Sequence, residues 1–116
     1  MPGIQKDPKR NFLSENLSRA KSRKDGKVFN ITVDDLIAIG EKQKWRCALT
    51  RKPLEFTRGG EYFGGKWANP RSCSIDRIDS EKGYVKENIQ LVLWAVNYMK
   101  SHLANDEFRM YAKLVK

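Results

Sequence analysis

Hydrophobic residues recur at intervals of three and four positions in several stretches of the chain, which is the spacing of amphipathic helices. We expect helices over residues 11–24, 32–43 and 86–101, and a last one from residue 105 onward. Thr32 and Asp35 have the spacing of a capping box, and Asn105 has the residue type of an N-cap. The helix over 86–101 is expected to bury one face, formed by Ile89, Val92, Leu93, Val96 and Met99.

Shorter hydrophobic pieces lie between the second and third predicted helices. Residues 45–50 and 54–56 predict short extended segments around a turn, and residues 73–78 predict a further strand that ends in a turn over 79–83. Between them, residues 57–70 contain glycines and the aromatic residues Tyr62, Phe63 and Trp67, a composition typical of a long loop. The sequence therefore predicts an α+β fold, mostly helical with a short β-hairpin. We expect a flexible arm over 1–10 and one domain over 11–116.

The charge of the chain indicates what kind of partner the protein binds. The 116 residues carry 23 Lys and Arg against 14 Asp and Glu, a formal net charge of +9. Such an excess either keeps the protein in solution or attracts a polyanion, and we favour the second reading. An anionic membrane is a weaker rival, because no stretch is apolar enough to span a bilayer and no basic helix carries a bulky apolar face. No signal peptide is evident, so we expect a cytoplasmic protein.

Two cysteines, Cys47 and Cys73, are too few for a disulfide framework. We expect both to be buried free thiols, with a single bridge between them as the less favoured alternative.

One segment concentrates polar residues in a specific pattern: Ser74-Ile75-Asp76-Arg77-Ile78-Asp79, then Gly83-Tyr84, Asn88, Asn97 and Lys100. This pattern resembles the HNH (ββα-metal, or His-Me finger) endonuclease superfamily, and in particular a phage-type branch of small HNH nucleases with a "DRID" motif. Phe29-Asn30-Ile31-Thr32 and residues 43–53 extend the resemblance upstream. The resemblance implies a nuclease core over about 45–101. If it extends to the origin of the protein, a phage encodes this protein, which then acts in the cytoplasm of the host cell.

The resemblance also implies a reaction. Members hydrolyse DNA phosphodiester bonds with a divalent ion that stabilises charge on the leaving oxygen. By position, Asp76 and Asn97 match the metal ligands, Asn88 matches the residue that ties down the loop, and Tyr84 belongs to the same structural motif. Oxygen ligands suit Mg²⁺ or Mn²⁺. Taken singly, Asp76 is a turn residue and Asn97 a polar residue on a helix, and only their joint spacing points to a metal site.

The position after the metal-binding Asp departs from the best-known members, which have a His there as general base. Here it is Arg77, whose guanidinium stays protonated and is suited to holding the phosphate instead. His102 is the only histidine, but on a continuous helix it would lie about 140° around the axis from Asn97. A helix that ends at Lys100 would reopen its candidacy as base or third ligand. The alternatives are a His at the helix C-terminus without catalytic role, Tyr84 or Tyr98 as base, and proton loss to solvent.

Many HNH proteins also hold a structural zinc ion through two Cys-x-x-Cys pairs. The corresponding positions here are Cys47 with Thr50 and Leu93 with Val96. We therefore expect no structural zinc, and a hydrophobic plug in its place.

Double-stranded DNA is the expected partner, bound through its phosphates and with low sequence specificity. The basic candidates are Lys21, Arg23, Lys24, Arg51, Lys52, Arg58, Lys66, Arg71, Arg77 and Lys100. Tyr62, Phe63 and Trp67 either contact DNA or pin their own loop. The enzyme would nick as a monomer or cut both strands as a homodimer. Two other functions remain open: a non-catalytic DNA-binding module, which Arg77 favours, and a phage DNA-packaging accessory protein that cleaves only beside a partner.

Overall fold

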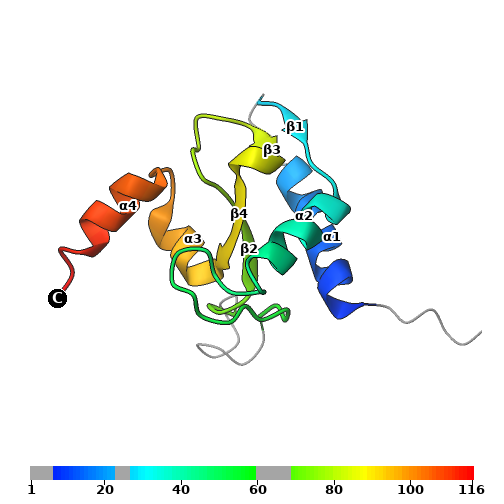
Figure 1. Ribbon diagram of the computed structural model, residues 1–116, viewed down its shortest axis with the longest axis horizontal. Coiled ribbons are helices and arrows are strands. Elements are labelled where there is room, and N and C mark those ends of the chain that lie inside the picture. The colour runs from blue at the N-terminus through cyan, green and yellow to red at the C-terminus, as the bar shows by residue number, and fades with distance from the viewer. Residues whose placement is uncertain (1–6, 23–26, 60–68) are drawn as a thin grey trace, which may run out of the picture.

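A computed structural model describes residues 7–22, 27–59 and 69–116 of the chain. These parts form an α+β fold with four α-helices and two small sheets. The α+β class agrees with the prediction from the sequence, whereas the parallel sheet was not expected. Figure 1 shows the strands β2 and β4 at the centre, with α1 and α2 on one side and α3 on the other, followed by α4 at the end of the chain. The basic candidates Arg23, Lys24 and Lys66, and the aromatic residues Tyr62, Phe63 and Trp67, lie outside the described residues.

The first two helices form close to the predicted positions. Helix α1 spans Pro8–Ser22, so residues assigned to a flexible arm are already helical. Helix α2 spans Val33–Lys42, and its capping box is confirmed: the Thr32 hydroxyl accepts from the Asp35 backbone N–H at 3.1 Å, and the Asp35 carboxylate accepts from the Thr32 N–H at 3.0 Å. This reciprocal cap satisfies two backbone donors that a helix start leaves unpaired.

The predicted helix over 86–101 is wrong in its first half. Lys86–Asn88 forms one 3₁₀ turn, Ile89–Leu93 is strand β4, and only Trp94–Lys100 forms helix α3. The first four residues of β4 are buried, including the polar Gln90, so the strand is covered on both faces and its hydrophobic spacing does not distinguish it from a helix. Met99, expected to be buried, is 62% exposed on α3.

The antiparallel pair of the fold is also not the predicted one. Residues 45–56 contribute only two isolated bridges, Arg46 with Pro53 and Glu55 with Ser72. The ladder forms instead between β2, Cys73–Arg77, and β4, with Asp76 directly opposite Gln90. Helix α3 follows β4 without a loop, so two antiparallel strands lead directly into one helix.

The hydrophobic core lies between this β2–β4 pair and the two N-terminal helices. It joins Phe12 and Leu13 of α1, Leu36 of α2, and Leu91 and Val92 of β4, with further residues from the connecting segments. The Gln43 side chain extends the edge of β4: its amide exchanges hydrogen bonds with the backbone N–H and C=O of Leu91 at 3.0 and 2.9 Å. The backbone N–H of Ala48 donates to the same Leu91 carbonyl at 2.9 Å, so Gln43 and Ala48 together occupy the edge where a neighbouring strand would pair.

Both cysteines are buried free thiols, as predicted. Cys47 and Val96 belong to the core and Leu93 packs against it, while Thr50 is exposed. Three of the four positions that resemble a zinc cage thus contribute to hydrophobic packing.

A second, shorter sheet closes the other end of the molecule. Strand β1, Phe29–Asn30, pairs in parallel with β3, Tyr84–Val85. Gly83 precedes β3, and a Cβ atom there would lie 2.4 Å from the carbonyl oxygen of Val28, so this close approach requires glycine.

The last helix, α4, spans Asn105–Ala112 and begins at the predicted residue, but Asn105 is not its cap. The cap position is Ala104, whose N–H donates to Glu107 at 3.0 Å. Phe108 packs against the core, whereas Tyr111 and Val115 are 53% and 79% exposed, so the apolar face predicted for this helix is mostly uncovered. No helix in the described ranges has both the length and the hydrophobicity to cross a bilayer.

Candidate functional site

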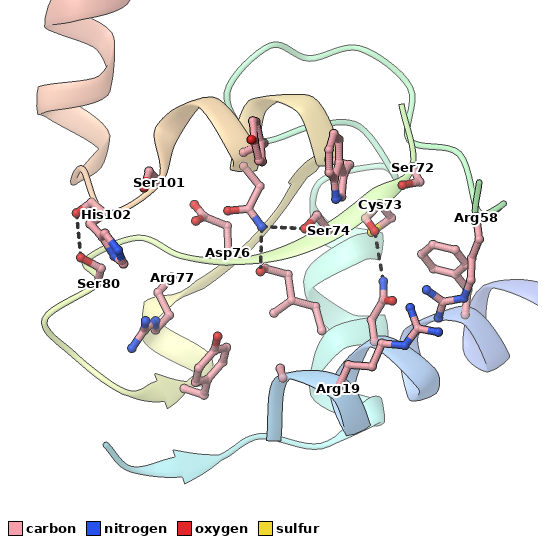
Figure 2. Close-up of a pocket in the computed structure, with 18 of the residues that line it drawn as sticks. Arg19, Arg58, Ser72, Cys73, Ser74, Asp76, Arg77, Ser80, Ser101 and His102 are labelled. Carbon is pink, nitrogen blue, oxygen red and sulfur yellow. Dashed lines mark hydrogen bonds between the residues drawn. The ribbon is translucent and has the colours of Figure 1, made fainter. Parts of the chain in front are cut away.

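An open groove of about 1030 Å³ runs along β2 between α1 and α3. It brings together six residues predicted for the site: Asp76, Arg77, Tyr84, Asn97, His102 and the DNA-contact candidate Arg58. Figure 2 shows Asp76 and Ser74 on β2, with His102 and Ser80 at one end of the groove and Arg19 and Arg58 at the other. Residues distant in sequence therefore meet around one strand.

Asp76 is 5% exposed, and its two carboxylate oxygens have different surroundings. Oδ2 accepts from the Gln90 amide at 2.8 Å and lies 2.9 Å from the Lys100 ammonium. Oδ1 receives no hydrogen bond from the described residues. Every side-chain oxygen or nitrogen that is fully buried in these residues does have a hydrogen-bond partner, so Oδ1 is not fully buried. Oδ1 is consequently reached by solvent, on a side chain that lines the groove.

Lys100, predicted to contact DNA, is instead completely buried. Its ammonium donates to the carbonyl of Arg77 at 2.8 Å and pairs with Asp76, so it cannot reach a phosphate outside. The prediction failed because a lysine near a helix end is normally exposed, and only the packing of α3 across β2 turns this one inward. Gln90 completes the network by exchanging amide hydrogen bonds with Asn105 of α4 at 2.9 and 3.2 Å.

Asn97 projects from the middle of α3 toward β2. Its amide nitrogen donates to the Ser74 hydroxyl at 2.6 Å and more weakly to the Ile75 carbonyl at 3.4 Å. Both bonds use the nitrogen, so the orientation of the amide is set and Oδ1 makes no hydrogen bond within the described parts of the chain. The groove is thus lined by a second side chain that has an uncommitted oxygen.

Asn88 holds the loop between β2 and β3. Its amide oxygen accepts from the Asp79 N–H at 3.0 Å, and its amide nitrogen donates to the carbonyls of Asp79 and Gly83 at 3.0 and 2.9 Å. The side chain is buried and does not line the groove. This geometry is that of a loop brace, the role that its position in the motif implies.

Arg77 follows Asp76 on β2 and lies over the ring of Tyr84, with the guanidinium carbon 4.9 Å from the ring centroid. The Tyr84 ring in turn packs on Phe29 at 5.0 Å. The guanidinium also donates to the Lys82 carbonyl at 3.3 Å. These contacts hold a permanent positive charge beside Asp76 at the groove wall.

His102 lies beyond the end of α3, because Ser101 adopts a left-handed conformation with φ of 52° and ends the helix after Lys100. The helical-wheel argument against His102 therefore does not apply. The Ser80 hydroxyl donates to the backbone carbonyl of His102 at 2.7 Å, which fixes the His102 backbone beside the β2–β3 loop (Figure 2). The exposed His102 side chain is the only imidazole of the chain and lines the groove with Asp76.

Three arginines, Arg19, Arg58 and Arg77, line the groove, and Asp76 is its sole acidic residue within the described ranges. Arg58 pairs with Glu15 at 2.9 Å and packs over Phe12. Arg19 was not among the sequence candidates, because nothing in its local sequence separates it from other basic residues of α1. The exposed residues Arg51, Lys52 and Lys21 do not line the groove, and Arg71 pairs with Glu55 at 2.9 Å.

Two aromatic side chains of α3 form part of the groove wall. Trp94 and Tyr98 stack with ring centroids 5.2 Å apart and planes at 14°, and Tyr98 remains 67% exposed. Both residues line the same groove as the arginines, and the Tyr98 ring faces solvent.

The Cys73 thiol, although it borders the groove, is unsuited to nucleophilic chemistry. Burial, together with a smaller contribution from the nearby Cys47, raises its pKa from 9.0 to about 12. The thiol therefore stays protonated at neutral pH, and only the thiolate is strongly nucleophilic.

Comparison with known protein families, curated proteins and solved structures finds no match to this chain. Its function is therefore inferred from the residues of the groove.

Proposed function

We propose that this protein is a divalent-metal-dependent DNA endonuclease in which β2, β4 and α3 form a ββα-metal core. The observation that carries the proposal is a pair of side-chain oxygens, Oδ1 of Asp76 and Oδ1 of Asn97, left without hydrogen bonds from the described residues on the walls of one groove. The arginines around them are suited to a polyanionic substrate.

The donor set fits a hard cation. A carboxylate oxygen and an amide oxygen are ligands that Mg²⁺ and Mn²⁺ accept, and such ions commonly keep several waters and take substrate phosphates as further ligands. When bound, the ion would polarise the phosphate and stabilise charge on the leaving oxygen. Asp76 and Asn97 would hold it, and the hydrogen bonds to Gln90 and Ser74 would keep the two side chains in place.

The remaining groove residues have separate roles in this proposal. Arg77 would hold a non-bridging phosphate oxygen, because its guanidinium cannot accept a proton at neutral pH. His102 would accept a proton from the attacking water, since histidine is the most common general base in proteins and this one lines the groove with Asp76. Asn88 would keep the β2–β3 loop, and with it Ser80 beside His102, in a single conformation.

Plasmid cleavage tests the proposal. Supercoiled DNA incubated with the protein and Mg²⁺ or Mn²⁺ should become nicked or linear, and EDTA should prevent this. Asp76→Ala should abolish cleavage, and Asn97→Ala should reduce it strongly. Asp106→Ala removes an exposed carboxylate on α4 and should cleave like the wild type. Cleavage that persists in EDTA or in the Asp76→Ala variant would rule the proposal out.

Arg77 favours a second candidate function, a DNA-binding module without cleavage, because it occupies the position of the general base in the superfamily that the motif resembles. The two functions differ in one measurement. A binding module would retain salt-sensitive DNA affinity and leave plasmid intact with every divalent ion. His102→Ala separates them further, since it should slow cleavage while DNA binding is retained.

A further inference from the structure

The buried contact between Asp76 and Lys100 has a consequence for ion binding, if the proposed metal site is correct. Asp76 is 5% and Lys100 0% exposed at the side chain, and their charged atoms lie 2.9 Å apart. The pair has a formal net charge of zero. Because Asp76 is the sole acidic residue among the described groove residues, the candidate ion site carries no net negative charge from this pair.

We propose that Lys100 is a positioning residue that makes binding of the divalent ion depend on DNA. A cation that approaches Oδ1 of Asp76 is attracted by the carboxylate and repelled by the ammonium on its other oxygen. At this depth neither interaction is screened as it would be in water. The ion alone therefore binds weakly.

Lys100 cannot move away to relieve this repulsion. Its ammonium also donates to the Arg77 carbonyl at 2.8 Å, and no part of its side chain reaches solvent. Gln90 holds the same Asp76 oxygen from the opposite strand and is itself held by Asn105. The neutralised carboxylate is thus a built-in property of the folded protein.

A DNA phosphate would supply the missing negative charge. The groove arginines would bring the phosphate to the site, where the ion would gain the phosphate oxygens as anionic ligands beside Asp76. Linkage makes the effect reciprocal: if DNA tightens ion binding by some factor, the ion tightens DNA binding by the same factor. Lys100 would in this way restrict the assembled centre to the substrate-bound state.

Mn²⁺ binding to the full chain tests this. The free Mn²⁺ signal in electron paramagnetic resonance is titrated with the protein alone and with its complex with a phosphorothioate duplex. Asp76→Asn, alone and with the same duplex, is the background for Mn²⁺ bound elsewhere. The Asp76-dependent Mn²⁺ should bind about tenfold tighter or more with DNA present. Duplex affinity measured by fluorescence anisotropy should rise by the same factor when Mn²⁺ is added.

Lys100→Met keeps the length of the side chain and removes its charge. In the absence of DNA this variant should bind Mn²⁺ about tenfold tighter than the wild type, within the usual range of such coupling. Lys86→Met removes the same charge from an exposed position and should change nothing. If circular dichroism shows that Lys100→Met does not fold, the wild-type titrations with and without DNA still decide.

The outcomes separate the two proposals. Asp76-dependent Mn²⁺ binding that is equally tight with and without the duplex would overturn the role of Lys100 and leave the nuclease proposal standing. Absence of any Asp76-dependent Mn²⁺ binding, with DNA or without it, would overturn the metal-dependent nuclease itself.

Discussion

The floor and the rim of the groove use charge in opposite ways. What we call the floor is Asp76, which lines the groove, with Gln90 and Lys100 behind it; all three are buried, and the charges of Asp76 and Lys100 neutralise each other at 2.9 Å. The rim, formed by Arg19, Tyr98 and His102, is exposed, and the Arg19 guanidinium makes no hydrogen bond or ion pair within the described residues. Removing one member of a buried pair leaves a charge without water or partner, whereas a rim charge stays solvated. The floor should therefore control stability and ion binding, and the rim should control attraction of DNA.

The largest expected effect is on the floor. Lys100→Met should lower the free energy of unfolding by about 3–5 kcal/mol, because it leaves the Asp76 carboxylate buried and uncompensated. The double variant Asp76→Asn with Lys100→Met removes both charges and should recover most of that loss. Urea denaturation of the two variants and of Asp76→Asn measures the coupling. A double variant no more stable than Lys100→Met would show that the pair does not govern stability.

A smaller effect is expected from Cys73, a core residue that also borders the groove. Its pKa is about 12 in the folded protein against 9.0 for a free thiol, so above pH 9 the unfolded state loses a proton that the folded state keeps. The free energy of unfolding should therefore be unaffected below pH 9 and fall above it, by at most about 1.4 kcal/mol per pH unit. Cys73→Ala should remove this part of the pH dependence. The free energy of unfolding of the wild type and of Cys73→Ala is measured between about pH 8 and about pH 10.5, in steps of about half a pH unit. Parallel curves for the two proteins would contradict this expectation.

The smallest effect on stability is expected at the rim. Arg19→Ala should change the free energy of unfolding by less than about 0.5 kcal/mol, because the side chain is exposed and its loss leaves nothing buried unpaired. DNA affinity should nevertheless fall, and the slope of log affinity against log salt should decrease by about 0.9 if Arg19 contacts one phosphate. Lys42→Ala on α2 makes the same change in net charge outside the groove. If both variants show the same salt slope, the rim has no special role.

Local sequence patterns were sufficient for the elements whose signals are local. The capping box of Thr32 and Asp35 requires only residues three positions apart, and it formed as predicted. The loop-bracing position of Asn88 and the strand that carries Asp76 likewise follow from short motifs. These features do not depend on which distant segments pack against them.

Pairing between distant segments decided the rest. Residues 89–93 have hydrophobic spacing that suits a helix. They become a strand because β2 pairs with one edge, and the Gln43 side chain and the Ala48 backbone hydrogen-bond the other. The turn at Ser101, and not the sequence position of His102, brings the imidazole to the groove.

The sequence by itself determined the α+β class, the two buried thiols, the capped helix α2 and the motif around Asp76 and Asn88. Only the tertiary structure decided that Lys100 faces inward and that Arg19 faces the groove. The physical reason is that the residue type fixes the charge of a side chain. Burial decides how much desolvation free energy that charge costs and which groups the side chain can contact. Burial is set by segments that meet only when the chain has folded.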